Sequence, residues 1–329
     1  MLASDAISEF FFISQICIGL TGNSVLFKLK MCTFITRSHL KKPIDVIFIH
    51  LTLVNVLTIM FKLIPDVMSS FGVRHFLDDV GCKATLFTHR VTRGLSICTT
   101  ALLSAYQAIT ISPVHSKWAW LKLKLSTCIY PSFLFFWVIN MLIYIHIIKT
   151  VVANLNFTIV GSGYSTLHCQ TNQLEHHYYS MAFLSVILIR DLLFVSLMAW
   201  SSLYMVTLLY KHRQRAPHIH SPTLSPRPSP EIQATHIILL LVSCFVFFYF
   251  SDNFITLYLF YRHEKNWRLK RMNGIISSCY PVICPFVLMK NNKIVSKCIS
   301  SISKMRMTFS RRTVKRWPDT RRQCRGSLE

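Results

Sequence analysis

Seven long apolar segments constrain the fold of this chain more than any other feature. A helix needs about 20 mostly apolar residues to cross the hydrocarbon layer of a membrane. An open backbone cannot satisfy its hydrogen-bonding groups in lipid, so each segment is predicted to be a helix. The fold class is therefore predicted to be all-α, a seven-transmembrane helix bundle. The spans are predicted near 8–29, 43–66, 82–112, 126–148, 180–210, 236–260 and 271–290, with Pro281 and Pro285 kinking the last one.

Composition supports the same class. The 329 residues are 52% hydrophobic and 15% charged, against about 25% charged in a typical soluble domain. A soluble protein of this size could not bury so much apolar surface in one core. The net charge of +23 could suggest a nucleic-acid binder, but the basic residues stand in short runs between apolar blocks, as in membrane proteins. No nucleic-acid partner is predicted.

The distribution of Lys and Arg predicts the orientation. Segments 28–42, 113–125, 211–235 and 290–329 hold 24 of these residues, and the other inter-span segments hold seven. Cytoplasmic loops carry the excess of positive charge, so the N-terminus is predicted outside and the C-terminus in the cytoplasm. The sequon at Asn156 then lies in an outer loop, where glycosylation is chemically possible.

Two cysteines fall on the predicted outer side. Cys82 stands at the mouth of the third span and Cys169 in the second outer loop. The outside is oxidising, so a Cys82–Cys169 disulfide is one interpretation and two unpaired thiols is the other.

The last forty residues are predicted to form a separate region. Residues 1–290 make the seven-helix domain, and 291–329 make a basic cytoplasmic tail. An apolar stripe from Ile294 to Met305 recurs at helical spacing between lysines. This pattern predicts a short amphipathic helix on the inner leaflet, with anionic membrane lipid as its partner.

The outer halves of spans three, five and six carry ionisable side chains, which are costly in lipid and by default mark function. Arg90 and Arg93 lie roughly 12 and 16 Å below Cys82, too deep to reach the surface easily, so both should face the bundle interior. Asp191 and Asp252 are the available counter-charges. The candidate ligand-binding residues are His89, Arg90, Arg93, Arg190, Asp191 and Asp252.

Two interpretations of these charges stay open. In the first, Arg90 or Arg93 pairs permanently with Asp191 or Asp252 and fixes helix packing. In the second, three arginines exceed two carboxylates, and a cation is left for a ligand. A guanidinium fork suits a carboxylate, sulfate or phosphate, and low dielectric strengthens the contact. The second interpretation predicts small amphipathic anions, with the acid head against Arg93.

Smaller polar side chains in the spans have more modest predicted roles. His50 is a candidate for a hydrogen bond to a neighbouring helix, and it has no second His or Cys four residues on to complete a metal site. Thr99, Thr100 and Ser104 are expected to return their hydroxyls to the helix backbone.

Five blocks resemble the vomeronasal type-1 receptors, a pheromone receptor family of G-protein-coupled receptors. They occur in the family's order from about residue 20 to residue 295. The blocks are GCKATLFTHRVTRGLSICTTALLSAYQAITISP (81–113), HLTLVNVLT (50–58), SLMAWSSLYMVTLLYKHRQR (196–215), SPEIQATHIILLLVSCFVFFY (229–249) and YPVICPFVLMKNNK (280–293).

The resemblance implies a chemosensory receptor in the plasma membrane of sensory neurons. It implies a small chemosignal as ligand, with sulfated steroids among the fitting molecules, and a heterotrimeric G protein of the inhibitory type. The chain departs from the wider rhodopsin-like pattern, because Gln107-Ala108-Ile109-Thr110 stands where Asp-Arg-Tyr would be expected. The switches of that wider group are therefore not carried over.

Other function classes are less consistent with the residues. A bitter-taste receptor is the nearest alternative, and the 81–113 block argues against it. A transporter or channel is the alternative from another class, but no repeat of the spans and no chain of acidic residues across the bilayer is visible. No nucleophile–base pair, metal triad or phosphate loop indicates an enzyme, and no cofactor or metal is predicted.

Overall fold

The structure, a computed structural model, describes residues 2–36, 43–71, 77–113, 119–153, 169–171, 177–215, 230–262 and 267–290. The chain divides into two compact units, Met1–Val287 and Leu288–Glu329. Of the second unit only 288–290 are described, as the last residues of a helix and a turn. The predicted amphipathic helix therefore lies outside the described residues.

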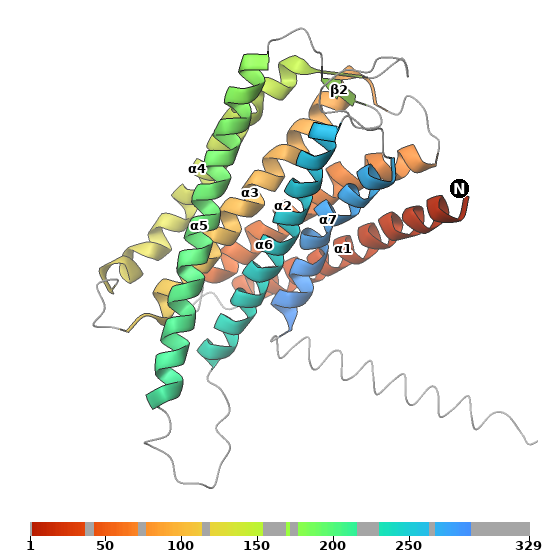
Figure 1. Cartoon of the computed structure of the whole chain (residues 1–329). Coiled ribbons are helices and arrows are strands. Elements are labelled where there is room, and N and C mark those ends of the chain that lie inside the picture. Colours follow the sequence, from red (N-terminus) through yellow and green to blue (C-terminus); the bar gives the residue numbers. More distant parts are fainter. Residues whose placement is uncertain are drawn as a thin grey trace, which may run out of the picture. The chain divides into compact units, whose positions relative to one another are not determined.

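Within the described ranges the chain forms seven helices and one two-stranded ladder (Figure 1). All seven helices are long and apolar enough to cross a membrane, which confirms the seven-helix fold of a multi-pass membrane protein. The helices extend beyond the predicted spans at most ends, because helical hydrogen bonds continue into polar flanks that the apolar count ignores. They are α1 (Leu2–Thr36), α2 (Pro43–Ser70), α3 (Asp79–Ile111), α4 (Ala119–Thr150), α5 (His177–Arg215), α6 (Pro230–Arg262) and α7 (Trp267–Met289).

Helix α3 is the central helix of the first unit. It contacts α2, α4, α5 and α6. Of its membrane-spanning window 72% is buried, against 22–50% in the other six helices. Polar side chains on α3 therefore face protein rather than lipid, which explains how the least apolar span is tolerated.

His50 joins three helices in the middle of the bundle. The indole N–H of Trp137 in α4 donates to His50 Nε2 at 3.0 Å, and Nδ1 lies 3.0 Å from Thr99 Oγ1 in α3. Because Nε2 accepts, Nδ1 carries the proton of a neutral ring and donates to Thr99. The predicted interhelical hydrogen bond of His50 is confirmed, whereas Thr99 contacts this ring instead of its own backbone. Thr100 does donate to its own helix, at the carbonyl of Ser96.

Helix α7 continues through both of its prolines. Pro285 has no N–H, so the carbonyl four residues earlier, at Pro281, lacks its helical donor. Asn23 in α1 supplies that donor, with Nδ2 2.9 Å from the Pro281 oxygen. Asn55 in α2 donates in turn to Asn23 at 3.4 Å. These bonds tie α1, α2 and α7 together where the proline would otherwise leave a buried polar atom unpaired.

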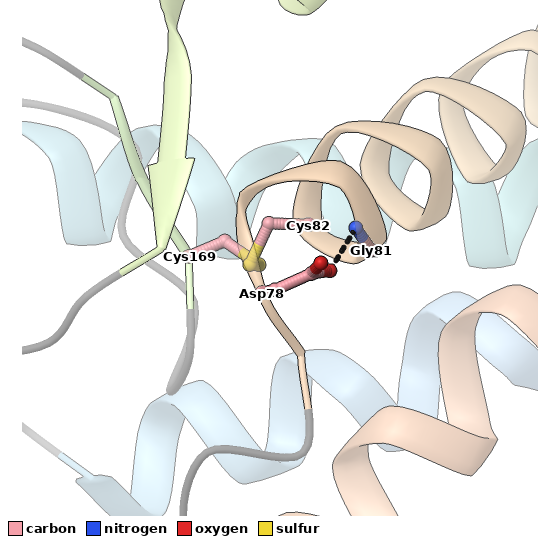
Figure 2. Close-up of a disulfide and its surroundings, with 4 residues drawn as sticks. All are labelled: Asp78, Gly81, Cys82 and Cys169. Carbon is pink, nitrogen blue, oxygen red and sulfur yellow. Dashed lines mark hydrogen bonds between the residues drawn. A yellow bond between two sulfur atoms is a disulfide. The ribbon is translucent and has the colours of Figure 1, made fainter.

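The first unit also contains a two-stranded ladder that the all-α prediction did not include. Strand β1 (Val151–Ala153) continues directly from α4 and pairs antiparallel with β2 (Cys169–Thr171). Cys169 forms a disulfide with Cys82 in the first turn of α3 (Figure 2). Asp78 caps the same turn by accepting the N–H of Gly81 at 2.7 Å, which fixes where α3 begins.

Candidate functional site

An ion pair between α3 and α6 forms the centre of the candidate site. The guanidinium of Arg93 donates to the carboxylate of Asp252, whose side chain is 3% exposed. A second guanidinium nitrogen donates to Asn253 Oδ1 at 3.2 Å. The same group lies over the ring of Tyr249, 5.1 Å from its centroid, which adds a cation–π contact. Arg93 is therefore held by three side chains of α6.

Asp252 has another partner on α7. With its amide turned so that both neighbours are satisfied, Asn273 donates to Asp252 Oδ1 at 3.1 Å and accepts from Thr256 Oγ1 at 3.0 Å. The carboxylate is thus bound by two helices, a cation from α3 and an amide from α7.

A second ion pair lies within α5, between the adjacent residues Arg190 and Asp191. Arg190 Nε donates to Asp191 Oδ1 at 2.8 Å. Its other nitrogens donate to Asn140 Oδ1 at 2.7 Å and to the Tyr144 hydroxyl at 3.0 Å, both on α4. A buried guanidinium must have its donors matched, and α4 supplies the partners that one carboxylate cannot.

Tyr249 connects the two ion pairs. Its hydroxyl donates to Asp191 Oδ2, while its ring lies against Arg93. The result is one polar network that runs from Asn140 on α4 through α5 and α6 to Asn273 on α7, with α3 contributing Arg93. In a low-dielectric interior such a network of matched hydrogen bonds fixes the positions of the helices that share it.

Gly94 makes room for this network on α3. A Cβ at this position would lie 2.6 Å from Arg190 Nη1 and closer still to Asn140 Oδ1. Real Cβ atoms essentially never approach other atoms so closely. Glycine is thus the residue that lets α4 and α5 meet against the central helix.

A pocket opens beside the Arg93–Asp252 pair, and the empty space counted in it, about 390 Å³, includes open solvent. Its described lining comes from α2, α3, α6 and α7. Four of the lining residues are aromatic, two of them tyrosines, and Arg93, Asp252 and three serine or threonine side chains add polar atoms. The lining residues are Thr58, Arg93, Ser96, Phe245, Phe248, Tyr249, Asp252, Ser277, Tyr280 and Pro281.

Ser96 has a buried hydroxyl that is not hydrogen-bonded within the part of the chain that the structure describes. The residue is 6% exposed and lines the pocket, and its Oγ has no hydrogen-bond partner among the described residues. Buried polar atoms are nearly always paired, so an unpaired hydroxyl at a pocket wall is a position where a bound molecule would complete the bonding.

The structure sorts the six predicted ligand-binding residues into three groups. Arg93 and Asp252 line the pocket. Arg190 and Asp191 belong to the network behind it and reach the pocket only through Tyr249. Neither His89 nor Arg90 is in the described lining. His89 is buried, and its Nε2 is unpaired among the described residues, whereas Arg90 is half-buried.

The observed pairing bears on both interpretations of the charges. Asp252 is paired with Arg93, which is one of the pairs that the packing interpretation names. Asp191 is paired with its neighbour Arg190, which that interpretation did not name. The ligand interpretation expects a cation left for a ligand, with the acid head against Arg93; Arg93 lines the pocket but is paired with Asp252. The ligand-binding role of these residues therefore remains a prediction. Asn156 lies outside the described residues.

Several members of the site were not predicted. Tyr249 is the one hydroxyl-bearing ring in the FVFFYF run of α6, and Asn140 is the one amide in an otherwise apolar stretch of α4. A lone polar group in an apolar span is a signal that could have indicated both. Nothing local to Ser96 distinguishes it from the other hydroxyl side chains of α3, so its unpaired state depends on the packing.

Known proteins match this chain over most of its length. The vomeronasal organ pheromone receptor family matches residues 6–301. Vomeronasal type-1 receptor 4 of Homo sapiens is 35% identical over 291 residues, 88% of this chain and 95% of that protein. Vomeronasal type-1 receptor 2 of Homo sapiens is 37% identical over 280 residues, 84% of this chain and 69% of that protein.

The similarity extends to rodents. Vomeronasal type-1 receptor 40 of Mus musculus is 34% identical over 307 residues, 90% of this chain and 94% of that protein. The family consists of signalling receptors rather than enzymes, and it binds small chemosignals and couples to G proteins. This confirms the resemblance and decides against the bitter-taste and transporter alternatives. The chain belongs to the vomeronasal organ pheromone receptor family and is a seven-helix G-protein-coupled pheromone receptor.

Proposed function

We propose that this receptor detects a small amphipathic anion, of which sulfated steroids are the fitting class, in the pocket beside Arg93. We place it in the plasma membrane of sensory neurons, coupled to an inhibitory heterotrimeric G protein. The observation that carries the proposal is the position of Arg93, a cation in the wall of a pocket that is otherwise largely aromatic.

The pocket wall favours a rigid apolar body. Phe245 and Tyr280 meet edge to face with centroids 4.7 Å apart, and Phe245 stacks on Tyr249 at 5.5 Å. Packed rings of this kind hold their shape and offer large apolar faces at low conformational cost. A fused-ring hydrocarbon skeleton would match them better than a flexible chain, which would lose rotational freedom on binding.

Arg93 supports an acidic head group on that body. A guanidinium presents parallel N–H donors that fit two oxygens of a sulfate or carboxylate, and it stays charged at any physiological pH. A neutral steroid would offer this group little. The proposal therefore separates anionic from neutral ligands of the same shape.

The opposite end of the same helices provides a route for the signal. Gln107 of α3 donates to Thr235 of α6 at 3.4 Å, and Ser112 of α3 lies 3.0 Å from the Tyr204 hydroxyl of α5. These neutral bonds link the three helices that also share the site network. A ligand with different affinity for two arrangements of α3 and α6 would shift their populations, and so the surface offered to the G protein.

The test compares estrone 3-sulfate with estrone in cells that express the receptor and an inhibitory G protein. Removing a charged hydrogen bond costs about 1.5–3 kcal/mol, so Arg93→Gln should lower the potency of the sulfate by about tenfold to a hundredfold. Inhibition of cyclic nucleotide accumulation is the readout, with surface expression measured in parallel.

The matched control is Lys62→Gln in α2. It removes a cation whose partner is Asp66, 3.2 Å away, and which is not in the described pocket lining. The potency of the sulfate at the Lys62→Gln receptor should equal its potency at the wild type. Equal responses of the wild type to the sulfate and to estrone, or an Arg93→Gln receptor that responds normally, would refute the anion proposal.

A further inference from the structure

We infer that the anion subsite consists of Arg93 together with Ser96, and that Asp252 occupies this subsite until a ligand's acid group takes its place. The inference rests on the proposed function and adds two things to it. It names a second donor for the ligand, and it makes the receptor's own carboxylate the competitor that the ligand displaces.

Arg93 and Ser96 are placed to act on one group. They are three residues apart on α3, so their side chains lie on the same face of the helix. Both line the pocket, and the Ser96 hydroxyl has no partner among the described residues. An oxygen of a bound acid that lies between them would accept from both. The other oxygens would remain available to the guanidinium.

Asp252 now holds the position that such an acid would need. Its carboxylate is bonded to Arg93 in the pocket wall. A second anion at the same guanidinium would meet a like charge in a poorly solvated site, which is unfavourable. The ligand's acid can therefore bind fully only when Asp252 releases Arg93.

The neighbours of the pair allow that exchange. Asn273 donates to Asp252 from α7, so the carboxylate keeps a partner after it loses the arginine. Asn253 of α6 accepts from a separate nitrogen of Arg93, so the guanidinium keeps one hydrogen bond after it loses the carboxylate. The exchange breaks the ionic contact between α3 and α6 while leaving each charged group hydrogen-bonded. Ligand binding is thereby coupled to the ionic contact between α3 and α6.

Substitutions at Ser96 and Asp252 should change the potency of estrone 3-sulfate in opposite directions. Ser96→Ala removes one neutral hydrogen bond and should lower potency by about threefold to tenfold. Asp252→Asn removes the competitor, so potency should rise by a similar factor and ligand-free signalling should increase. Ser201→Ala is the control, because this buried serine in α5 bonds its own helix and is not in the described lining.

A receptor in which Ser96→Ala leaves the potency of the sulfate unchanged overturns the inference, and so does an Asp252→Asn receptor with unchanged or reduced potency at normal surface expression. If Asp252→Asn does not reach the surface, Asn273→Leu replaces it. That change leaves the displaced carboxylate without its second partner, so it should lower potency, and unchanged potency overturns the inference.

The same set of variants distinguishes failure of this inference from failure of the proposed function. Loss of response in Arg93→Gln with no effect of Ser96→Ala or Asp252→Asn overturns only the exchange at the subsite. A normal response in Arg93→Gln, or a wild type that does not distinguish the sulfate from estrone, overturns both. Loss of the sulfate response in Asp252→Asn at normal surface expression, with a wild type that distinguishes the sulfate from estrone and a weakened Arg93→Gln receptor, overturns the exchange and leaves the proposed function standing.

Discussion

At Gly94 of α3, polar atoms of α4 and α5 occupy the space that a side chain would need. The absence of a side chain there permits the polar network. Asn140 and Arg190 both occupy the space that a Cβ would need. Arg190 depends on this approach, because Asn140 accepts one of its five N–H donors at 2.7 Å. A larger residue would separate the amide from the arginine as well as crowd the helices.

Gly94→Ala is therefore predicted to destabilise the receptor by about 1–3 kcal/mol through overpacking, and to weaken ligand response because Arg190 and Asp191 lose their fixed positions. Thermal unfolding of the purified receptor in detergent measures the first effect. Gly274→Ala in α7 is the matched control, since its Cβ would come no closer than 3.3 Å to Asp66 Oδ2. Equal melting temperatures for the two variants would contradict this explanation.

His50 shows what can and cannot be predicted for a single residue. A polar ring in an apolar span must find a partner, so a bond to a neighbouring helix was predictable from the residue alone. Its partners, Trp137 and Thr99, were not, because they lie 87 and 49 residues away and meet it only through packing. Thr99 illustrates the reverse case, in which a tertiary partner replaced the expected local one.

At the scale of elements, one covalent bond joins the ladder β1–β2 to α3. The ladder β1–β2 begins where α4 ends, and Cys169 anchors β2 to the capped first turn of α3. The two cysteines are 87 residues apart in the chain. Closing so long a loop restricts the unfolded chain strongly, and the short ladder by itself would be marginal.

Replacing both cysteines, Cys82→Ser with Cys169→Ser, should destabilise the receptor by about 2–5 kcal/mol and reduce the amount at the cell surface. Surface labelling and thermal unfolding are the measurements. Cys128→Ser, which changes an exposed free thiol on α4, is the control and should leave both unchanged. A double variant that unfolds at the wild-type temperature would show that the ladder is held by other contacts.

Helix α7 shows an element whose continuity depends on its neighbours. The two prolines predict a kink in this span, and α7 is continuous through both. Asn23 on α1 donates to the carbonyl that Pro285 deprives of its partner. A proline in a membrane helix is tolerable where another helix brings a donor to the freed carbonyl. The proline is visible in the sequence, but its compensating donor is a residue 258 positions from that carbonyl.

At the scale of the whole molecule, the orientation in the membrane remains a prediction from charge. An epitope fused after Glu329 should be detected only in permeabilised cells, and one fused before Met1 on intact cells. Asn156→Gln should remove a glycan and increase mobility in a denaturing gel. Detection of the C-terminal epitope on intact cells would reverse the orientation and would move the disulfide to the reducing side.

The number of helices, their approximate bounds and the family could all be predicted from the amino-acid sequence, because they follow from information that is local along the chain. The length of an apolar segment decides whether a helix can cross lipid, and blocks such as 81–113 and 229–249 carry the family resemblance. The ionisable residues that need an interior partner could also be identified, because a charge in a span is costly wherever the other helices lie.

How those residues combine was settled only by the folding of the helices against one another. Which arginine pairs with which carboxylate, and whether a hydroxyl such as that of Ser96 finds a partner, depend on the rotation and depth of each helix against its neighbours. These quantities are set by packing among residues far apart in the chain, as at Gly94, where one absent Cβ lets α4 and α5 approach α3. Pairing across helices is a property of the packed bundle and cannot be inferred from spacing along any one of them.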